Sequence, residues 1–229
     1  GYSMDLCGHI IDAVKKRLNL PGLEIVSVPT TAGTRQVMLE SGAIDLQCAS
    51  ETNTLQRQRY LAFSVSTFVS GIKALVRKDS GIRSIEEMKG KIVITTLGTT
   101  SEALVKTIAV RRGLAFSYRT GRNPDDSLRQ VVAGQADAMV LDEVSLHGML
   151  ANLPASEAEK LAVVDEDFAV EPYGIMLRRN DPEFKQLIDD TLISLMKSGE
   201  LSRLYDRWFM SPIPPQGKNF NLPMGDLLK

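Results

Sequence analysis

The clearest structural signals in this chain lie in residues 35–64, which read RQVMLESGAIDLQCASETNTLQRQRYLAFS. A helical segment over about residues 34–41 ends at a glycine, and a short apolar strand over residues 44–49 follows at once. The chain before it has the same order, with a helical period over residues 4–18 and a strand-like run over residues 23–28. This alternation with short joints predicts a largely parallel α/β sheet.

Hydroxyl side chains and a cation follow the strand over residues 44–49, namely Ser50, Thr52, Thr54 and Arg57. A guanidinium can hold a carboxylate through two parallel hydrogen bonds, and the hydroxyl oxygens of Ser50 and Thr52 can accept from an ammonium group. These residue types together indicate a site for an α-amino acid. The alternative is an ordinary polar turn beside a solvated arginine.

The same local pattern occurs a second time in the chain. Residues 35–45 and 129–137 both contain RQV, then a glycine, then an aspartate that introduces an apolar strand. Helix and strand signals also alternate through residues 84–141, which indicates a second α/β series. The repeat is short, so it suggests two similar lobes without proving them.

Two long extended segments, Thr67–Lys78 and Phe168–Arg178, connect these series and contain few turn signals. We therefore expect two α/β lobes joined by two crossover hinge strands, with the ligand cleft between the lobes at the carboxyl ends of the strands. The expected lobes are residues 1–68 with 173–229, and residues 69–172.

The composition excludes several classes of protein. Lys and Arg total 27 against 28 for Asp and Glu, and this balance gives no basic stripe for nucleic acid. Apolar runs have the length of strands, far below that of a membrane span. Cys7 and Cys48 allow one disulfide, and two buried apolar thiols are equally compatible with the sequence. Their spacing fits no metal or redox motif.

Residues that can complete a ligand site also occur elsewhere. The loop GTTSE over residues 98–102 places Thr99 and Glu102 at capping-box spacing before a helix, where backbone N–H groups can bind an anion. Asp142 ends a strand, where it can pair with an ammonium or cap the next helix. Arg35 can meet a side-chain carboxylate or face solvent. An ordinary capped helix remains the alternative for the GTTSE loop.

Together with residues 44–64, several motifs resemble the amino-acid-binding family of type II periplasmic binding proteins, which are the receptors of ABC transporters. They are GYSMDLC (1–7), TTLGTTSE (95–102), DDSLRQVVAGQADAMVLDE (125–143), YGIMLRRNDPEF (173–184) and SGELSRLYDRWFMSPIPP (198–215). The resemblance covers nearly the whole chain. Within this family, the chain is most similar to glutamate/aspartate-binding proteins, which share the GTTSE loop, the YG-MLR segment and the WF–PIPP ending.

The resemblance implies a periplasmic receptor that binds a polar, acidic L-amino acid and delivers it to a membrane permease, without catalysis, cofactor or metal. Arg57 and Thr100 match the positions that hold the α-carboxylate, and Arg35 matches the position that reaches a distal carboxylate. The positions matching those that bind the α-ammonium group are Ser50, Thr52 and Asp142. A signal peptide, absent from this chain, is expected to have been removed.

Some positions depart from the family pattern. Gln56 replaces a glutamate, and Ala32 and Pro124 stand where the similar acidic-ligand binders have a serine and a histidine. The loss of two polar partners can weaken an acidic ligand or redirect the pocket to glutamine, asparagine or another ligand. The family also has a strand and loop before GYS, so we expect a longer native chain or a neighbour's segment in that place.

Two other functions stay open on the sequence. Some members of this fold are enzymes such as cyclohexadienyl dehydratases, which need a carboxylate positioned to move a proton. Asp142 and Glu51 are the carboxylates near the expected site, and no His or Lys has a catalytic context. The other alternative is a sensory domain of a larger receptor or channel.

Overall fold

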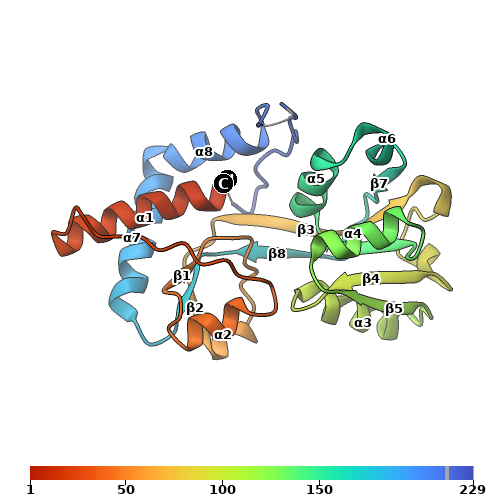
Figure 1. The fold of residues 1–229 in the computed structure, drawn as a ribbon, viewed down its shortest axis with the longest axis horizontal. Coiled ribbons are helices and arrows are strands. Elements are labelled where there is room, and N and C mark those ends of the chain that lie inside the picture. The colour runs from red at the N-terminus through yellow and green to blue at the C-terminus, as the bar shows by residue number, and fades with distance from the viewer. Residues whose placement is uncertain (215–216, 229) are drawn as a thin grey trace. The chain divides into compact units, whose positions relative to one another are not determined.

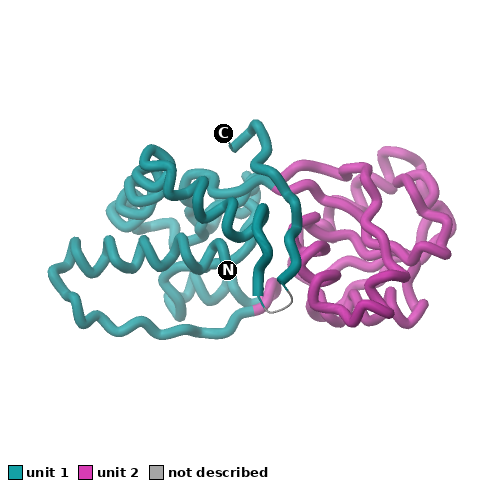
Figure 2. The backbone as a smooth tube through the Cα atoms, turned by 90° about the horizontal axis from the view of Figure 1, so that it is seen from above, with its two compact units in different colours: residues 1–30, 34–69, 172–229 teal, residues 31–33, 70–171 magenta. Residues whose placement is uncertain are grey.

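The computed structural model describes residues 1–214 and 217–228. The chain divides into two compact units (Figure 2). Unit 1 comprises Gly1–Thr30, Thr34–Val69 and Pro172–Lys229, and unit 2 comprises Thr31–Gly33 and Ser70–Glu171. Two of the unit boundaries fall inside strands that pair with each other, β3 (Phe68–Arg77) and β8 (Ala169–Tyr173). These strands correspond to the extended connecting segments expected from the sequence.

Helices that pack on one another form much of unit 1 (Figure 1). The α-helices described in this unit are α1 (Tyr2–Leu18), α2 (Arg35–Glu40), α7 (Pro182–Ser198) and α8 (Glu200–Phe209). Asp181 followed by Pro182 predicts the start of a helix, and the structure confirms it. Pro182 is the first residue of α7, and the side chain of Asp181 accepts a hydrogen bond from the backbone N–H of Phe184. α1, α7 and α8 contact each other, so their apolar faces are shared in one layer.

An aromatic cluster completes the core of unit 1. Its rings lie within 4.7 to 6.2 Å of one another, centroid to centroid, and belong to Tyr2, Phe68, Tyr173, Tyr205 and Phe209. The hydroxyl of Tyr2 donates to the carbonyl of Thr67 at 2.8 Å. Burial, followed by the nearby Tyr205, raises the pKa of Tyr2 well above its usual value. The cluster therefore anchors the N-terminal helix to the start of β3.

The sheet of unit 1 is antiparallel, which corrects the parallel sheet expected here. Its strands are β1 (Leu46–Gln47), β2 (Leu61–Phe63) and β9 (Met176–Arg178), in the order β1-β9-β2. The sequence could not show that β9, from the far end of the chain, returns between β1 and β2. Residues 23–28 were expected to be a strand and are not one, because no described strand pairs with them. Their side chains are largely exposed, with Val26 at 74%.

Unit 2 contains a mixed sheet in the order β5-β4-β6-β3-β7, with β8 beside β3. The further strands are β4 (Ile92–Thr96), β5 (Ser117–Gly121), β6 (Ala138–Asp142) and β7 (Leu161–Val163). β4 is parallel to β5 and β6, whereas β3 runs antiparallel to β6 and β7. The parallel part is therefore limited to the strands connected through helices.

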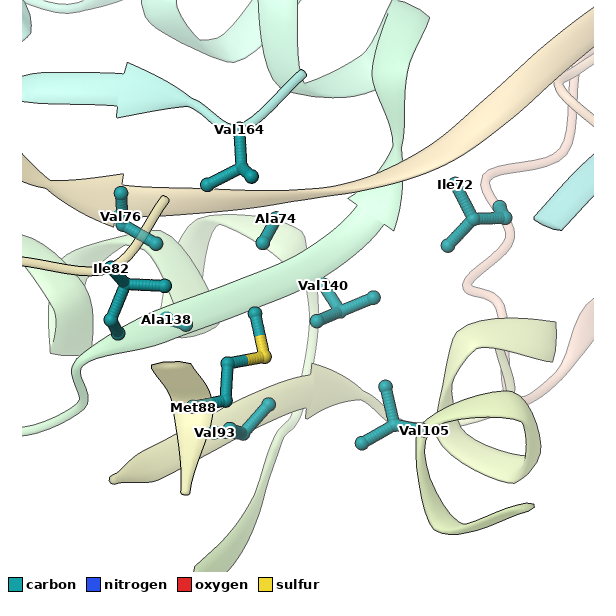
Figure 3. Packing of buried hydrophobic residues seen from close by; sticks show 10 residues of the cluster. All are labelled: Ile72, Ala74, Val76, Ile82, Met88, Val93, Val105, Ala138, Val140 and Val164. Carbon is teal, nitrogen blue, oxygen red and sulfur yellow. The ribbon is translucent and has the colours of Figure 1, made fainter. Parts of the chain in front are cut away.

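Both faces of the unit 2 sheet are covered by helices (Figure 1). They are α3 (Thr100–Arg112), α4 (Pro124–Val132), α5 (Glu143–Asn152) and α6 (Ala155–Ala158). Along β6, Ala138 and Val140 pack with Val105 of α3 on one face, as Figure 3 shows, and Met139 and Leu141 pack on the other face with α4 and α5. This alternation is the period-two pattern of a strand buried on both sides.

Single turns of 3₁₀-helix occur at η1 (Arg57–Arg59), η2 (Lys78–Ser80) and η3 (Glu86–Met88). The sequence predicts a helix over residues 84–88, and the structure has the single turn η3 in its place. Among residues 1–214 and 217–228, no helix is long and apolar enough to cross a membrane.

Candidate functional site

Residues 50–54 follow β1 and carry the hydroxyl groups of Ser50, Thr52 and Thr54; we call them the hydroxyl segment. Hydrogen bonds with the backbone of residues 172–174 fix this segment. The N–H of Gly174 donates to the carbonyl of Glu51 at 3.1 Å, and the N–H of Asn53 donates to the carbonyl of Pro172 at 2.9 Å. Between them, Thr52 forms an isolated β-bridge with Tyr173. Ser50 is partly buried and Thr52 is buried. Ser50 and Thr52, two of the residues expected to bind an ammonium group, therefore lie on one segment of unit 1 whose backbone is fixed by hydrogen bonds.

A disulfide between Cys7 and Cys48 ties this segment to α1. The Cα atoms of the two cysteines are 6.2 Å apart, and Cys7 is fully buried. Of the two possibilities left open by the sequence, the structure has the disulfide. The cross-link lies two residues before Ser50, so it restrains the same backbone that carries the hydroxyl groups.

Arg57 is buried, with 7% of its surface exposed, and lies at the start of η1. Its Nη1 donates to the carbonyl of Thr52 at 2.9 Å, and its backbone N–H donates to Oγ1 of Thr54 at 3.1 Å. The solvated-arginine alternative is wrong for this residue. The carbonyl of Thr52 therefore helps to fix the orientation of a buried guanidinium, a group that can bind a carboxylate through two parallel hydrogen bonds.

Arg35 is the first residue of α2, and its side chain points to an acidic partner within unit 1. Its Nη1 lies 2.8 Å from Oε1 of Glu51, and the exposed fractions of the two side chains are 12% and 0%. The solvent-facing alternative for Arg35 is therefore wrong. Nε of Arg35 is buried and has no hydrogen-bond acceptor among the described residues. The guanidinium thus keeps the capacity for one further acceptor.

Thr100 is the first residue of α3 in unit 2, and a carboxylate already lies against it. Its Oγ1 donates to Oε2 of Glu171 at 2.7 Å. The expected capping box is wrong, because the hydroxyl of Thr99 donates back to the carbonyl of Thr96 at 2.7 Å and makes no bond to the helix. The hydroxyl of Thr100 therefore already has a carboxylate partner within unit 2.

Asp142 ends β6 and precedes α5, as expected, and it is 8% exposed. Its side chain makes no capping hydrogen bond to α5, so the capping alternative is wrong. The next residue, Glu143, lies 2.9 Å from Nζ of Lys73 and 3.7 Å from Nε2 of His147. Hydrogen bonding to His147, and then to Lys73, holds the pKa of Glu143 below its usual value.

The two altered positions both lie in structured parts of unit 2. Pro124 is the first residue of α4, and the side chain of Asn123 caps that helix by accepting from the N–H of Asp126 at 2.9 Å. The carbonyl of Ala32 lies next to Gly98, and a Cβ added at Gly98 would lie 2.7 Å from that carbonyl oxygen. A side chain at Gly98 would therefore displace the loop that begins α3.

Sequence reasoning missed the roles of Glu51 and Glu171 as internal partners. Glu171 is 71 residues from Thr100 along the chain, and no local pattern connects them. Glu51 was visible as a carboxylate within the hydroxyl segment, but its pairing with Arg35 depends on how α2 packs. Among residues 1–214 and 217–228, no group of three or more His, Cys, Asp or Glu side chains is placed to hold a metal ion.

The antiparallel sheet of unit 1, the mixed sheet of unit 2 and the two connecting strands belong to the type II periplasmic-binding-protein fold. Residues 1–211 match the family described as bacterial extracellular solute-binding proteins, family 3, and the chain belongs to that family.

Relatives of known function match the whole chain. A glutamate/aspartate import solute-binding protein of Salmonella typhimurium is 38% identical over 229 residues, which are 100% of this chain and 75% of the relative. The L-glutamate/L-aspartate-binding protein of Pseudomonas aeruginosa is 36% identical with the same coverage. The similarity to these relatives therefore extends over both units.

Solved structures with the same fold bind several amino acids. An ancestral arginine-binding protein bound to arginine is 29% identical, with a TM-score of 0.79, over 91% of this chain and 88% of that one. The GluR0 ligand-binding core of Nostoc punctiforme in complex with L-glutamate is 27% identical, with a TM-score of 0.74, over 91% of both chains. The fold alone therefore does not select the ligand.

Proposed function

We propose that this protein is the periplasmic receptor of an ABC importer and that it binds L-glutamate and L-aspartate. The observation that carries the proposal is the match of the whole chain to glutamate/aspartate-binding relatives at 36 to 38% identity. Two arginines of unit 1, the buried Arg57 and the partly buried Arg35, support it, because an acidic amino acid presents two carboxylates. Its partner is a permease in the membrane.

The proposed contacts follow from the chemistry of each side chain. Arg57 in unit 1 and Thr100 in unit 2 bind the α-carboxylate, and the hydroxyl of Thr100 exchanges its bond to Glu171 for one to the ligand. The acceptors of the α-ammonium group are Ser50, Thr52 and Asp142. Arg35 binds the side-chain carboxylate of the ligand through donors that its contact with Glu51 leaves available.

We further propose that the protein releases its ligand unchanged. An enzyme of this fold would need a carboxylate free to move a proton. Glu51, one of the two candidates, already lies 2.8 Å from the guanidinium of Arg35, so its carboxylate is engaged within the protein. A structural relative described as a precursor of cyclohexadienyl dehydratase, 29% identical, makes a direct assay of turnover necessary.

Calorimetric titration with L-glutamate, L-aspartate, L-glutamine, L-asparagine and L-lysine tests the proposal, with turnover of prephenate and arogenate measured in parallel. We expect saturable binding of glutamate and aspartate, weak or no binding of lysine, and no turnover. Binding of lysine alone, or turnover of either cyclohexadienyl compound, would contradict the proposed function.

A further inference from the structure

The ion pair between Arg35 and Glu51 has a direct consequence for ligand choice. Both residues belong to unit 1, their charged atoms are 2.8 Å apart, and the side chain of Glu51 is 0% exposed. A carboxylate removed this completely from water needs a counter-ion, since an isolated buried charge is costly. Arg35 supplies that charge, so its own positive charge is already balanced within the protein.

A ligand carboxylate that reaches Arg35 therefore meets a neutral pair. The guanidinium of Arg35 attracts the ligand carboxylate, but the carboxylate of Glu51, which is in contact with that guanidinium, repels it. The amide of glutamine carries no charge, so it avoids this repulsion while it still accepts a hydrogen bond from Arg35. Nε of Arg35, buried and without an acceptor among the described residues, provides a donor for either group.

We propose that Glu51 is a specificity-determining residue that reduces the preference of the protein for acidic side chains over their amides. This inference rests on the proposed function, because it takes Arg35 as the partner of the ligand's side chain. Glu51 acts by neutralising Arg35, and it does not have to touch the ligand.

The test compares dissociation constants for L-glutamate and L-glutamine, measured by calorimetric titration, in the wild type and in Glu51→Gln. The wild-type constants are expected to agree within about tenfold. In Glu51→Gln, the ratio of the glutamine constant to the glutamate constant should rise by about tenfold or more, because the like charge is gone and the shape of the side chain is kept. Glu40→Gln removes an exposed charge from α2, the helix that carries Arg35, and should leave the ratio unchanged.

A second variant and a double variant separate this effect from misfolding. Glu51→Thr also removes the charge with a smaller side chain, and it should raise the ratio in the same direction. In Arg35→Gln/Glu51→Gln neither charge remains, so the ratio should fall to about one. Circular dichroism and thermal unfolding establish that each variant is folded before it is titrated.

Each outcome bears on one of the two proposals. A ratio that stays the same or falls in both Glu51 variants overturns the role of Glu51, and so does a wild type that prefers glutamate by more than about a hundredfold. A wild type that binds neither glutamate, aspartate nor their amides overturns the proposed function itself.

Discussion

Arg57 is buried in unit 1 and Arg35 is partly buried there, and the surroundings of the two arginines differ. Arg57 is oriented by a neutral carbonyl, that of Thr52, whereas Arg35 lies against the carboxylate of Glu51. A carboxylate at 2.8 Å offsets the positive charge of Arg35. In the proposed site, Arg57 binds the carboxylate that all amino acids share, and Arg35 responds to the side chain of the ligand.

Replacing Arg57 with lysine keeps the charge and removes the planar fork of donors. We expect Arg57→Lys to lower the affinity for every amino acid ligand by about tenfold or more, glutamate and glutamine alike. The reason is that lysine cannot make two parallel hydrogen bonds to one carboxylate. Calorimetric titration measures the effect, and Arg59→Lys, an exposed position in the same 3₁₀ turn, is the matched control. Affinity that stays within about twofold in Arg57→Lys would exclude Arg57 as the anchor of the α-carboxylate.

Glu143 gives a pH-dependent contribution to stability. Its pKa is lowered in the folded protein, first by His147 and then by Lys73, so the ionised form is stabilised by folding. This contribution is present above the unfolded pKa and is lost as the pH falls through the lower folded value. When the pH is lowered from about 6 to about 3, the free energy of unfolding should therefore fall less in Glu143→Gln than in the wild type.

Urea unfolding at each pH measures this difference. The exposed Glu40→Gln variant, which removes the same charge elsewhere, should follow the wild type. Parallel pH curves for Glu143→Gln and the wild type would mean that the contacts with His147 and Lys73 are absent in solution.

At the scale of elements, the repeat over residues 35–45 and 129–137 has the same structural role in both units. Each copy has a helix, a glycine that ends it and an aspartate before a strand. Gly42 and Gly134 have φ of 76° and 72° and end their helices, which a residue with a side chain does less readily. The aspartate that follows each glycine pairs with an arginine of a neighbouring strand. The pairs are Asp45 with Arg178 at 3.0 Å, and Asp137 with Arg77 at 3.8 Å.

This repeat could be predicted because its parts are close together in the sequence, whereas the pairing of strands could not. The order of β1, β9 and β2 depends on a strand more than a hundred residues away, and the strand signal over residues 23–28 had no described partner to pair with. Arg35 and Arg57 were recognisable as candidates from residue type and spacing. Their different partners, Glu51 and the carbonyl of Thr52, depend on packing and became visible only in the structure.

The disulfide connects two elements of unit 1, α1 and the segment after β1, which are separated by 41 residues in sequence. Closing a loop of this length restricts the unfolded chain, and a stabilisation of about 3 to 4 kcal/mol is expected. Reduced wild type and Cys7→Ala/Cys48→Ala should both unfold at lower urea concentration than the oxidised protein, by similar amounts. Equal urea midpoints for the oxidised and reduced wild type would show that the bond does not form or does not stabilise the fold.

At the scale of the whole molecule, each unit has its own core. Unit 2 has apolar clusters on both faces of its sheet, and unit 1 has its helical layer and aromatic cluster. The fold class could be predicted from the sequence because helix and strand signals alternate in two series joined by extended segments. Two units with separate cores can also unfold in separate steps, so the effect of a ligand can be followed in each of them.

The proposed ligand contacts occur in both units, with Arg57 in unit 1 and Thr100 and Asp142 in unit 2. Ligand at a hundred times its dissociation constant adds about 2.7 kcal/mol to the stability of what it binds. For a chain of this size, that corresponds to a rise in unfolding temperature of about 5 to 10 °C. Scanning calorimetry with L-glutamate should therefore show the whole unfolding profile at higher temperature, and any separate transitions should both move. Arg57→Ala should remove the rise, and L-lysine should not produce it. If one of two resolved transitions stays at its ligand-free temperature, the contacts proposed for the unit that unfolds in that transition are wrong.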